Sequence, residues 1–262
     1  MPPQVARHAT VNRHARLFVA FVMLVSLLGL ACASPLPHKR AAGESVAKRA
    51  AIVDQLAGTD PDQALIDDLR DRLERSGYVV DYYPPASVTV DLYKRLFAGN
   101  YSLTILRSRS ALHRPIGVLG IKTVSLFTNE PYSADQHLPE QRASQLFRAW
   151  YPGDAARRMH FSVHPQFIQS RAAGQLPHGS VVVLLGCAGL SSEDMARAFV
   201  ARGASAFISW DQNVTVDQHD AAVLPLITHL IERHMDARDA VAITNQELGA
   251  DPAARARLVA FP

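Results

Sequence analysis

The chain has 262 residues, of which 48% are hydrophobic, and it carries 27 Lys and Arg against 24 Asp and Glu. This composition suffices for one sizeable core and excludes collagen-like, low-complexity and wholly disordered chains. The first 33 residues contain three arginines and no acidic residue, so they account for the whole net charge of +3. Because the remainder is neutral, it lacks the electrostatic footprint of a nucleic-acid-binding protein, and we expect no nucleic-acid partner.

The amino terminus has the layout of an export signal. A basic stretch leads into the uncharged apolar run Leu17–Ala31, which ends in the small residues Ala31, Cys32 and Ala33. We expect a signal peptide that is cleaved after Ala33. The expected boundaries are a signal at 1–33, a linker at 34–48 and one folded domain at 49–262.

Two alternatives for this segment stay open. The apolar run is somewhat short for a spanning helix of about 20 residues, so a retained anchor is the second choice. A lipoprotein signal with a lipid on Cys32 is the third, although Gly29 stands where such signals usually have Leu. In each case we expect an exported protein, secreted or held at the cell envelope. It would meet a membrane only through the amino-terminal signal or a lipid on Cys32.

The chain has two cysteines, and their state depends on that signal. Cleavage after Ala33, or a lipid on Cys32, leaves Cys187 without a disulfide partner, whereas a Cys32–Cys187 disulfide requires that the signal is retained. An unpaired cysteine in an exported protein is a candidate reactive thiol. The alternative is that Cys187 is a small buried hydrophobic residue.

Helical and extended segments alternate along the first part of the domain. Apolar residues recur at helical spacing before Gly77, and Thr89 is a candidate cap for the helix that follows it. The predicted segments, in chain order, are a helix at 65–73, a strand at 78–83, a helix at 90–97, and strands at 103–107, 122–127 and 160–163.

The second part of the domain contains the clearest unit. An unbroken apolar run over 180–185 predicts a buried strand, Ser191 and Ser192 offer caps for a helix that ends at Gly203, and 204–210 predicts the next strand. Strand, helix and strand in about thirty residues form a βαβ unit, which predicts a parallel sheet. Two further helices are predicted over 221–235, kinked at Pro225, and over 238–248.

Cys187 follows a predicted strand in the turn Gly186-Cys187-Ala188-Gly189, which leads into a helix. Ligands of open α/β sheets bind at the carboxyl ends of the strands. Backbone N–H groups at a helix start can lower a thiol pKa and stabilise an oxyanion, and Gly186 allows a substrate backbone to approach. The alternative is a tight turn with Cys187 packed beneath it.

The segment Val181–Val223 resembles the second half of the caspase-like cysteine peptidases, especially their CHAT branch. The shared features are an apolar strand that ends in cysteine, an "ARAF…GA" helix and a strand that ends in Trp210. The helix that contains Asp239-Ala240-Val241 resembles the closing helix of the branch. The resemblance implies a single α/β domain with a mostly parallel central sheet and helices on both faces. It also implies that Cys187 is the nucleophile and that Trp210 lies beside the cleft.

The family places its base, usually as His-Gly, after an earlier central strand. The best matching strand here, 103–107, is followed by Arg109 and Ser110 at that place, and His113 comes a few residues later. His113 is the preferred candidate base, with His164 and His178 as alternatives. An arginine stays protonated, so Arg109 is expected to bind a carboxylate or phosphate, or to stabilise a thiolate by its charge.

Two other polar groups complete the expected site. Glu130 ends an apolar stretch and is a candidate substrate-binding residue at the carboxyl edge of the sheet. Asp217, His219 and Asp220 are metal-ligand types, but their spacing is typical of a capped first helical turn, so we expect no metal and no cofactor.

The sequence therefore predicts an exported cysteine peptidase-like protein that acts on a peptide or protein. Its nucleophile would be Cys187, its base His113, and its substrate-binding residues Arg109, Gly186, Glu130 and Trp210. The alternative is a catalytically inactive relative that binds a peptide or an anionic ligand at the cell envelope. A scaffold without a small ligand is the third possibility.

Overall fold

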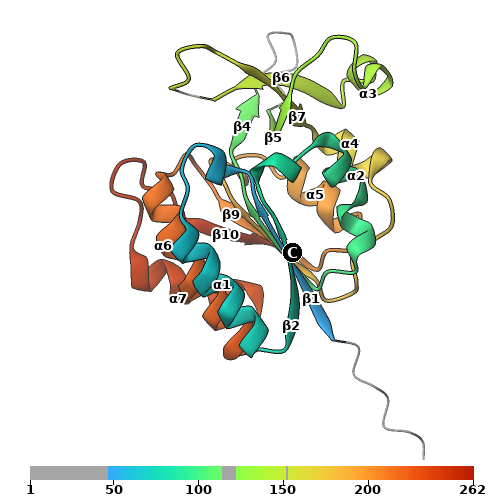
Figure 1. Ribbon diagram of the computed structural model, residues 1–262. Coiled ribbons are helices and arrows are strands. Elements are labelled where there is room, and N and C mark those ends of the chain that lie inside the picture. The colour runs from blue at the N-terminus through green and yellow to red at the C-terminus, as the bar shows by residue number, and fades with distance from the viewer. Residues whose placement is uncertain (1–46, 114–121, 152) are drawn as a thin grey trace, which may run out of the picture. The chain divides into compact units, whose positions relative to one another are not determined.

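A computed structural model describes residues 47–113, 122–151 and 153–262 of the chain (Figure 1). The predicted signal at 1–33 and most of the predicted linker lie outside the described residues. The folded unit extends to Pro262 and begins its first strand at Lys48, one residue before the expected boundary. Among the described helices, none has both the length and the apolar character of a membrane span.

The main sheet has six strands in the order β10-β9-β8-β3-β1-β2. All neighbouring pairs are parallel except β10 and β9, which are antiparallel. The strands are β1 (Lys48–Asp54), β2 (Tyr78–Tyr83), β3 (Leu103–Arg107), β8 (Val181–Leu185), β9 (Ala206–Trp210) and β10 (Leu258–Phe261). The prediction of a mostly parallel sheet is therefore confirmed, as is the βαβ unit formed by β8 and β9.

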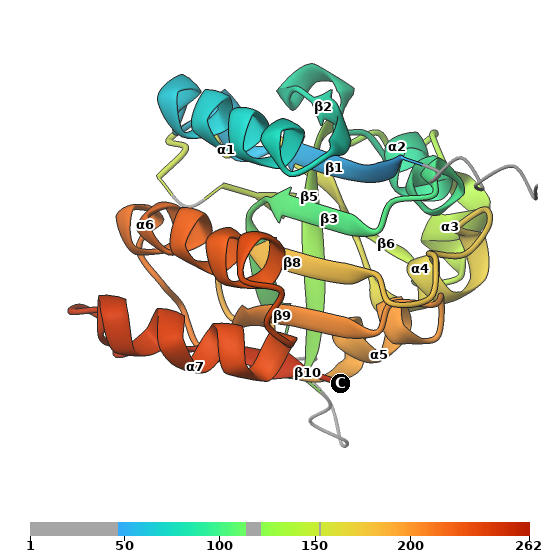
Figure 2. The same cartoon turned by 90° about the horizontal axis from the view of Figure 1, so that it is seen from below.

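Helices cover both faces of the main sheet (Figures 1 and 2). On one face lie α1 (Gln63–Arg75), α6 (Val216–Ile227) and α7 (Ala237–Leu248), and on the other α2 (Val90–Arg95), α4 (Pro165–Arg171) and α5 (Asp194–Val200). Each face has its own hydrophobic core, because the strands are buried on both sides. The short helical turns are η1 (Leu56–Gly58), η2 (Pro85–Ser87), η3 (Leu96–Gly99) and η4 (Thr228–Glu232).

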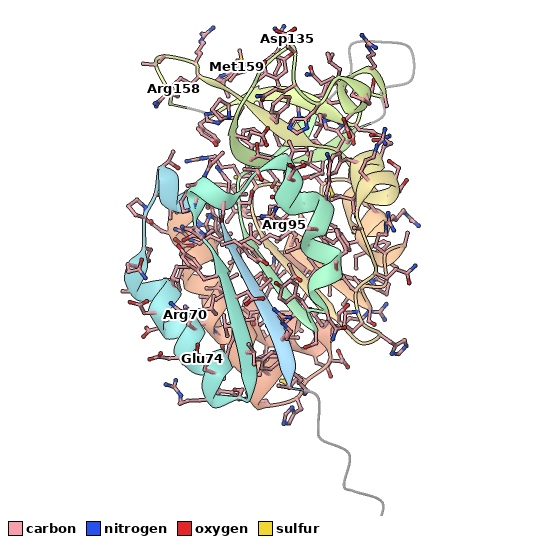
Figure 3. The ribbon with its side chains drawn as sticks, turned by 45° about the vertical axis from the view of Figure 1, so that its right-hand side comes forward. Arg70, Glu74, Arg95, Asp135, Arg158 and Met159 are labelled. Atoms are coloured by element: carbon pink, nitrogen blue, oxygen red, sulfur yellow. The ribbon has the colours of Figure 1, made fainter. Side chains whose placement is uncertain are left out.

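The predicted helix at 65–73 is α1, and its formation follows from its sequence. The Asp62 side chain accepts the Leu65 N–H at the start, and the stripe Leu65, Ile66, Leu69 and Leu73 is buried against the sheet. Its charged residues lie on the other side, where Glu74 is exposed (Figure 3). In the same way, the Thr89 side chain accepts the Leu92 N–H at the start of α2, as predicted.

Pro225 lies inside α6, and the chain continues after that helix as the π-helix η4. Proline has no N–H to donate, and a locally widened turn is one way in which a helix accommodates it. The helix starts at Val216, five residues before the predicted start, because Thr215 accepts the Gln218 N–H as its cap.

A second, four-stranded sheet lies at the carboxyl ends of the parallel strands (Figure 1). It is antiparallel throughout, in the order β4-β5-β7-β6. Asp135, Arg158 and Met159 mark its end farthest from the main sheet (Figure 3). Its strands are β4 (Ser110–His113), β5 (Thr123–Pro131), β6 (Leu146–Trp150) and β7 (Met159–Val163), and α3 (Leu138–Arg142) lies between β5 and β6.

This second sheet corrects the expectation of a single central sheet, because the predicted strands at 122–127 and 160–163 belong to it. The sheet is curled. In a flat sheet its edge strands β4 and β6 would lie about 14 Å apart, whereas the rings of His113 on β4 and Phe147 on β6 have centroids 6.2 Å apart. The curl gives the sheet a concave face, on which these rings lie.

The prediction that Ser191 or Ser192 caps α5 is wrong. The helix begins at Asp194, and no side chain caps its amino terminus. Ser191 Oγ donates instead to the Asp211 carbonyl, and Ser192 Oγ donates to the Lys122 carbonyl. The two serines therefore connect the segment after β8 to the loops beside it.

Candidate functional site

A cavity of about 900 Å³ opens at the carboxyl edge of the main sheet, where the second sheet meets it. The two sheets contribute different walls. From the loops of the main sheet come Cys187, Ala188, Ser191, Gln212 and Asn213. From the second sheet and the residue before it come Arg109, Ser110, Ala111, Leu112, His113, Phe127, Arg148, Ala149 and Trp150.

Cys187 lies in the turn after β8, at the edge where the sequence places it. The turn is held by its neighbours: Ala188 has a left-handed backbone with φ of 55°, and its N–H donates to the Gln212 carbonyl at 2.8 Å. The thiol is half-buried, and its Sγ donates to the Val214 carbonyl oxygen at 3.3 Å. Cys187 therefore lines the cavity, and its hydrogen bond to Val214 directs the thiol to the loop before α6.

Gly186 supports this turn rather than lining the cavity. A Cβ at this position would lie 2.3 Å from the Ser108 carbonyl oxygen and 2.6 Å from Ser110 Oγ. No side chain fits there, so a glycine is needed where the turn after β8 packs against the start of β4. Its role in the structure is to allow this close approach.

His113 ends β4 and lines the same cavity as Cys187. Its Nε2 lies 2.7 Å from Ser125 Oγ on the neighbouring strand β5. Burial lowers the pKa of His113 below its usual value, so its imidazole is neutral at pH 7 and can accept a proton. The predicted nucleophile and the preferred predicted base thus line the same cavity, but no hydrogen bond within the described residues joins them, since Cys187 Sγ donates to Val214 and His113 Nε2 lies beside Ser125.

Neither of the two alternative histidines lines the cavity. His164 follows β7, and its ring stacks on Phe147 with centroids 4.0 Å apart and lies 5.0 Å from the ring of His113. Burial, together with the charge of His113, lowers the pKa of His164 to about 3. His178 is exposed and precedes β8, at the opposite end of that strand from Cys187.

Arg109 enters the cavity from the segment between β3 and β4. Its Nη2 pairs with Asp60 Oδ2 at 2.7 Å, and its backbone N–H donates to Gln55 Oε1 at 2.8 Å. Arg148 on β6 is a second, exposed cation in the wall, and it forms no ion pair with any described residue. Asp60 compensates the charge of Arg109, and no Asp or Glu lines the cavity within the described part, so the charge of Arg148 makes the wall favour an anionic group.

Glu130 and Trp210 have other contacts. Glu130 accepts the Val90 N–H at 2.8 Å, at the start of α2, and pairs with His137 at 2.6 Å. Trp210 is 1% exposed and packs in the core beneath α6 and α7. Neither residue is among those that line the cavity, so the structure does not bring them to Cys187.

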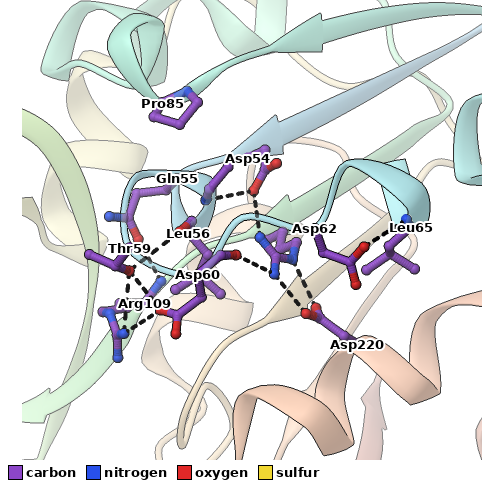
Figure 4. A network of polar contacts seen from close by, with 12 residues as sticks. Asp54, Gln55, Leu56, Thr59, Asp60, Asp62, Leu65, Pro85, Arg109 and Asp220 are labelled. Carbon is purple, nitrogen blue, oxygen red and sulfur yellow. Dashed lines mark hydrogen bonds and ion pairs between the residues drawn. The ribbon is translucent and has the colours of Figure 1, made fainter. Parts of the chain in front are cut away.

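Beside this site lies a buried ion network that was not predicted from the sequence. The Arg107 guanidinium, at the end of β3, donates to Asp54 Oδ1 at 2.9 Å and to Asp220 Oδ2 at 2.6 Å, and it also bonds the Asp60 carbonyl. Asp54, Asp60 and Asp220 converge on this point from β1, the following loop and α6 (Figure 4). The pattern that could have revealed it is an arginine at the end of a buried strand whose other residues are apolar except for Thr104.

This network also accounts for two members of the group Asp217, His219 and Asp220, because His219 and Asp220 belong to it, whereas Asp217 is exposed and takes no part. Burial acts to raise the pKa of Asp220, but the hydrogen bonds from Arg107 and His219 outweigh it and hold that pKa below its usual value. Asp220 therefore remains a carboxylate that connects α6 to the main sheet. Over the described ranges, no cluster of three or more His, Cys, Asp or Glu is arranged to hold a metal ion.

The chain matches no protein-family model, and no curated protein matches it significantly.

Proposed function

We propose that this protein is an exported cysteine peptidase-like hydrolase of caspase-like architecture, with Cys187 as nucleophile and His113 as base. The observation that carries the proposal is that Cys187 and His113, which are far apart in the sequence, line one cavity. A half-buried imidazole that is neutral at pH 7 suits the role of a base.

The topology supports the caspase-like assignment. The resemblance requires the base to follow a central strand that comes earlier in the chain than the cysteine strand. Here β3 and β8 are parallel neighbours, so the segments that follow them meet at the same edge of the sheet. Helices on both faces of the main sheet agree with the same architecture.

In the proposed reaction, His113 accepts the proton of the Cys187 thiol, which leaves its hydrogen bond to the Val214 carbonyl. The thiolate attacks the carbonyl carbon of a peptide bond. His113 then returns the proton to the departing amine, and an acyl-enzyme remains. Water, deprotonated by His113, hydrolyses this thioester and restores the thiol. If Nε2–H of His113 donates to Ser125, Nδ1 is the atom that takes the proton.

The wall of the cavity indicates the class of substrate. Arg109 and Arg148 are both cations, and Trp150 adds a large, half-exposed apolar surface. A peptide or protein segment with an acidic side chain would pair with the arginines. We propose no cofactor and no nucleic acid as partner. Export rests on the signal predicted at 1–33, and membrane contact would come only from that signal or a lipid on Cys32.

A second candidate function is a catalytically inactive module that binds an acidic peptide. It is favoured by Arg109, which follows β3 where the resemblance places the base, and which Asp60 and Gln55 hold in place. In this case the thiol keeps its bond to the Val214 carbonyl, and the cavity binds without cleaving.

Incubation of the purified full chain with a proteome-derived peptide mixture tests the proposal, with new amino termini identified by mass spectrometry. We expect cleavages that vanish with Cys187→Ala and fall by about 100-fold or more with His113→Ala. Val259→Ala, at an exposed position on β10, is the control and should retain full activity. The absence of any Cys187-dependent cleavage overturns the peptidase proposal.

A further inference from the structure

Two asparagines of the chain stand in the pattern Asn-x-Ser/Thr, which is the acceptor pattern for N-linked glycosylation in exported proteins. They are Asn100, at 100–102 (Asn-Tyr-Ser), and Asn213, at 213–215 (Asn-Val-Thr). In neither case is the middle residue a proline, the one residue type that the pattern excludes. The two asparagines are therefore candidate modification sites, provided that the fold leaves their side chains accessible.

The four asparagines among the described residues divide in the same way as the pattern does. Asn100 and Asn213 are exposed, and within the described residues neither side chain forms a hydrogen bond. Asn129 and Asn245, which lie outside the pattern, are half-buried, and both donate to backbone carbonyls of distant segments, at 3.0 and 2.9 Å. The fold thus uses the amides of Asn129 and Asn245 and leaves the other two accessible to a modifying group.

The local backbone explains an asparagine at position 100 but not at position 213. Asn100 follows η3 with φ of 55°, a left-handed conformation that asparagine adopts more readily than most residues. Asn213 does not have a left-handed backbone. Its neighbours have structural roles, since Val214 is buried and Thr215 caps α6. The turn therefore accounts for Val214 and Thr215 and gives no structural reason for an asparagine before them.

The two sites lie at opposite ends of the main sheet. Asn100 precedes β3, at the amino end of a parallel strand, whereas Asn213 lies between β9 and α6, at the carboxyl end, and lines the cavity together with Cys187. The N–H of Ala188 donates to the carbonyl of Gln212 at 2.8 Å, so the residues next to Cys187 and next to Asn213 are in direct contact. A glycan on Asn213 would thus begin at the wall that carries the thiol.

We propose that the protein carries N-linked oligosaccharides on Asn213 and Asn100, and that the glycan on Asn213 limits the access of large molecules to Cys187. In the transfer, Nδ2 of the asparagine forms a bond to the first carbon of a sugar, and the bond from that carbon to a lipid pyrophosphate carrier breaks. The amide loses one proton, the pyrophosphate leaves with the bonding electrons, and nothing is oxidised or reduced. The inference rests on the proposed export and does not require that Cys187 cleaves peptides.

The first test uses the full protein purified from the cells that produce it. Peptide-N-glycosidase in heavy-oxygen water converts each glycosylated asparagine to a labelled aspartate, which mass spectrometry of the peptides locates. We expect label at Asn100 and Asn213 and none at Asn129 and Asn245, which are the internal controls. Absence of label from Asn213 overturns the inference. Equal label at the control asparagines overturns it as well, because that result would come from spontaneous deamidation.

The amino-terminal peptide of the same sample separates this inference from the proposed export. A mature chain that begins at Ser34 and has no label at Asn213 overturns only the glycosylation. A chain that stays inside the cell with residues 1–33 and without label overturns both. Label at Asn213 in a protein that never cleaves a peptide leaves the inference intact and contradicts only the peptidase proposal.

Thiol labelling of the glycosylated protein tests where the glycan on Asn213 lies. The rates at Cys187 are compared for iodoacetamide and for a maleimide attached to a large polyethylene glycol chain. Asn213→Gln should raise the rate with the large reagent, relative to iodoacetamide, by about threefold or more. Asn100→Gln removes the glycan at the opposite end of the sheet and should leave this ratio unchanged. Both variants replace the asparagine, because Thr215 caps α6. An unchanged ratio in Asn213→Gln overturns the claim that this glycan limits access to Cys187.

Discussion

Ser110 Oγ donates a hydrogen bond of 2.6 Å to the carbonyl oxygen of Cys187. This bond joins the second sheet, which Ser110 begins, to the turn after β8 that carries the thiol. It lies beside Gly186, where the two segments approach so closely that no side chain fits between them. The two walls of the cavity are therefore fixed to each other at the cysteine.

Replacement of Gly186 by Ala tests this close approach. Its Cβ would lie 2.3 Å from the Ser108 carbonyl oxygen, so β4 or the cysteine turn must move. We expect Gly186→Ala to lower the free energy of unfolding by about 1 to 3 kcal/mol, measured by urea titration. Gly58→Ala is the matched control, since its Cβ would meet its nearest atoms at an ordinary 3.5 Å. Equal stability of the two variants would contradict the packing described.

Removal of the buried Arg107 guanidinium should destabilise the folded protein more than Gly186→Ala does. Its side chain is 2% exposed, and Arg107→Leu would leave Asp54 and Asp220 without their cation. We expect a loss of about 3 to 5 kcal/mol in the free energy of unfolding. Arg197→Met removes an exposed ion pair with Glu193 and should cost less than about 1 kcal/mol. If Arg107→Leu lowered the free energy of unfolding as little as Arg197→Met does, the network would contribute nothing to stability.

The buried histidines make stability depend on pH. The pKa of His164 is about 3 in the folded protein and 6.5 in an unfolded chain, so the unfolded state binds the proton first as the pH falls. The contribution of His164 is therefore fully present above about pH 6.5 and decreases towards pH 3, by up to about 1.4 kcal/mol per pH unit. His113 and His160, whose pKa values are also lowered by burial, act in the same direction.

Urea unfolding between pH 7.5 and pH 5 measures this dependence. His164→Phe keeps an aromatic ring against Phe147 and removes the titrating group. The slope of the free energy of unfolding against pH should therefore decrease by the amount that corresponds to about one proton bound on unfolding. The same slope in both proteins would mean that His164 titrates alike in the folded and unfolded states.

The main sheet was predictable from the sequence because most of its strands are unbroken apolar runs. β8 and β9 are buried along their length and are separated by one amphipathic helix, a pattern that specifies a parallel pair. β1 was missed although it is equally buried, because its basic start, Lys48-Arg49, resembles the linker before it. β10 was missed because it is short and comes after a loop at the carboxyl terminus.

The second sheet was not predictable as a unit. β4 has only four residues, and β6 does not alternate regularly between buried and exposed positions. Their pairing depends on β5 and β7, which the sequence predicts only as separate strands. It also depends on the curl of the sheet, which brings His113 near Phe147. Local patterns carry no information on such long-range pairing.

For the site, the sequence placed Cys187 and Arg109 at the carboxyl edge of the sheet, because each follows a strand that is recognisable by itself. It did not reveal the contacts that Glu130 makes with Val90 and His137, since these come from α2 and from the segment before α3. Arg107 was interpreted only as the polar end of a strand, because its ion-pair partners Asp54 and Asp220 are distant in the sequence.

The alkylation of Cys187 by iodoacetamide near pH 7 tests the central claim most directly. Its rate is followed by mass spectrometry of the peptide that contains Cys187, in the native full chain, in the urea-unfolded chain and in His113→Gln, which can still bond to Ser125. If His113 is the base, the native thiol should react at least about tenfold faster than the unfolded one, and His113→Gln should abolish the difference. A native rate no faster than the unfolded rate, or one that does not depend on His113, would contradict the account.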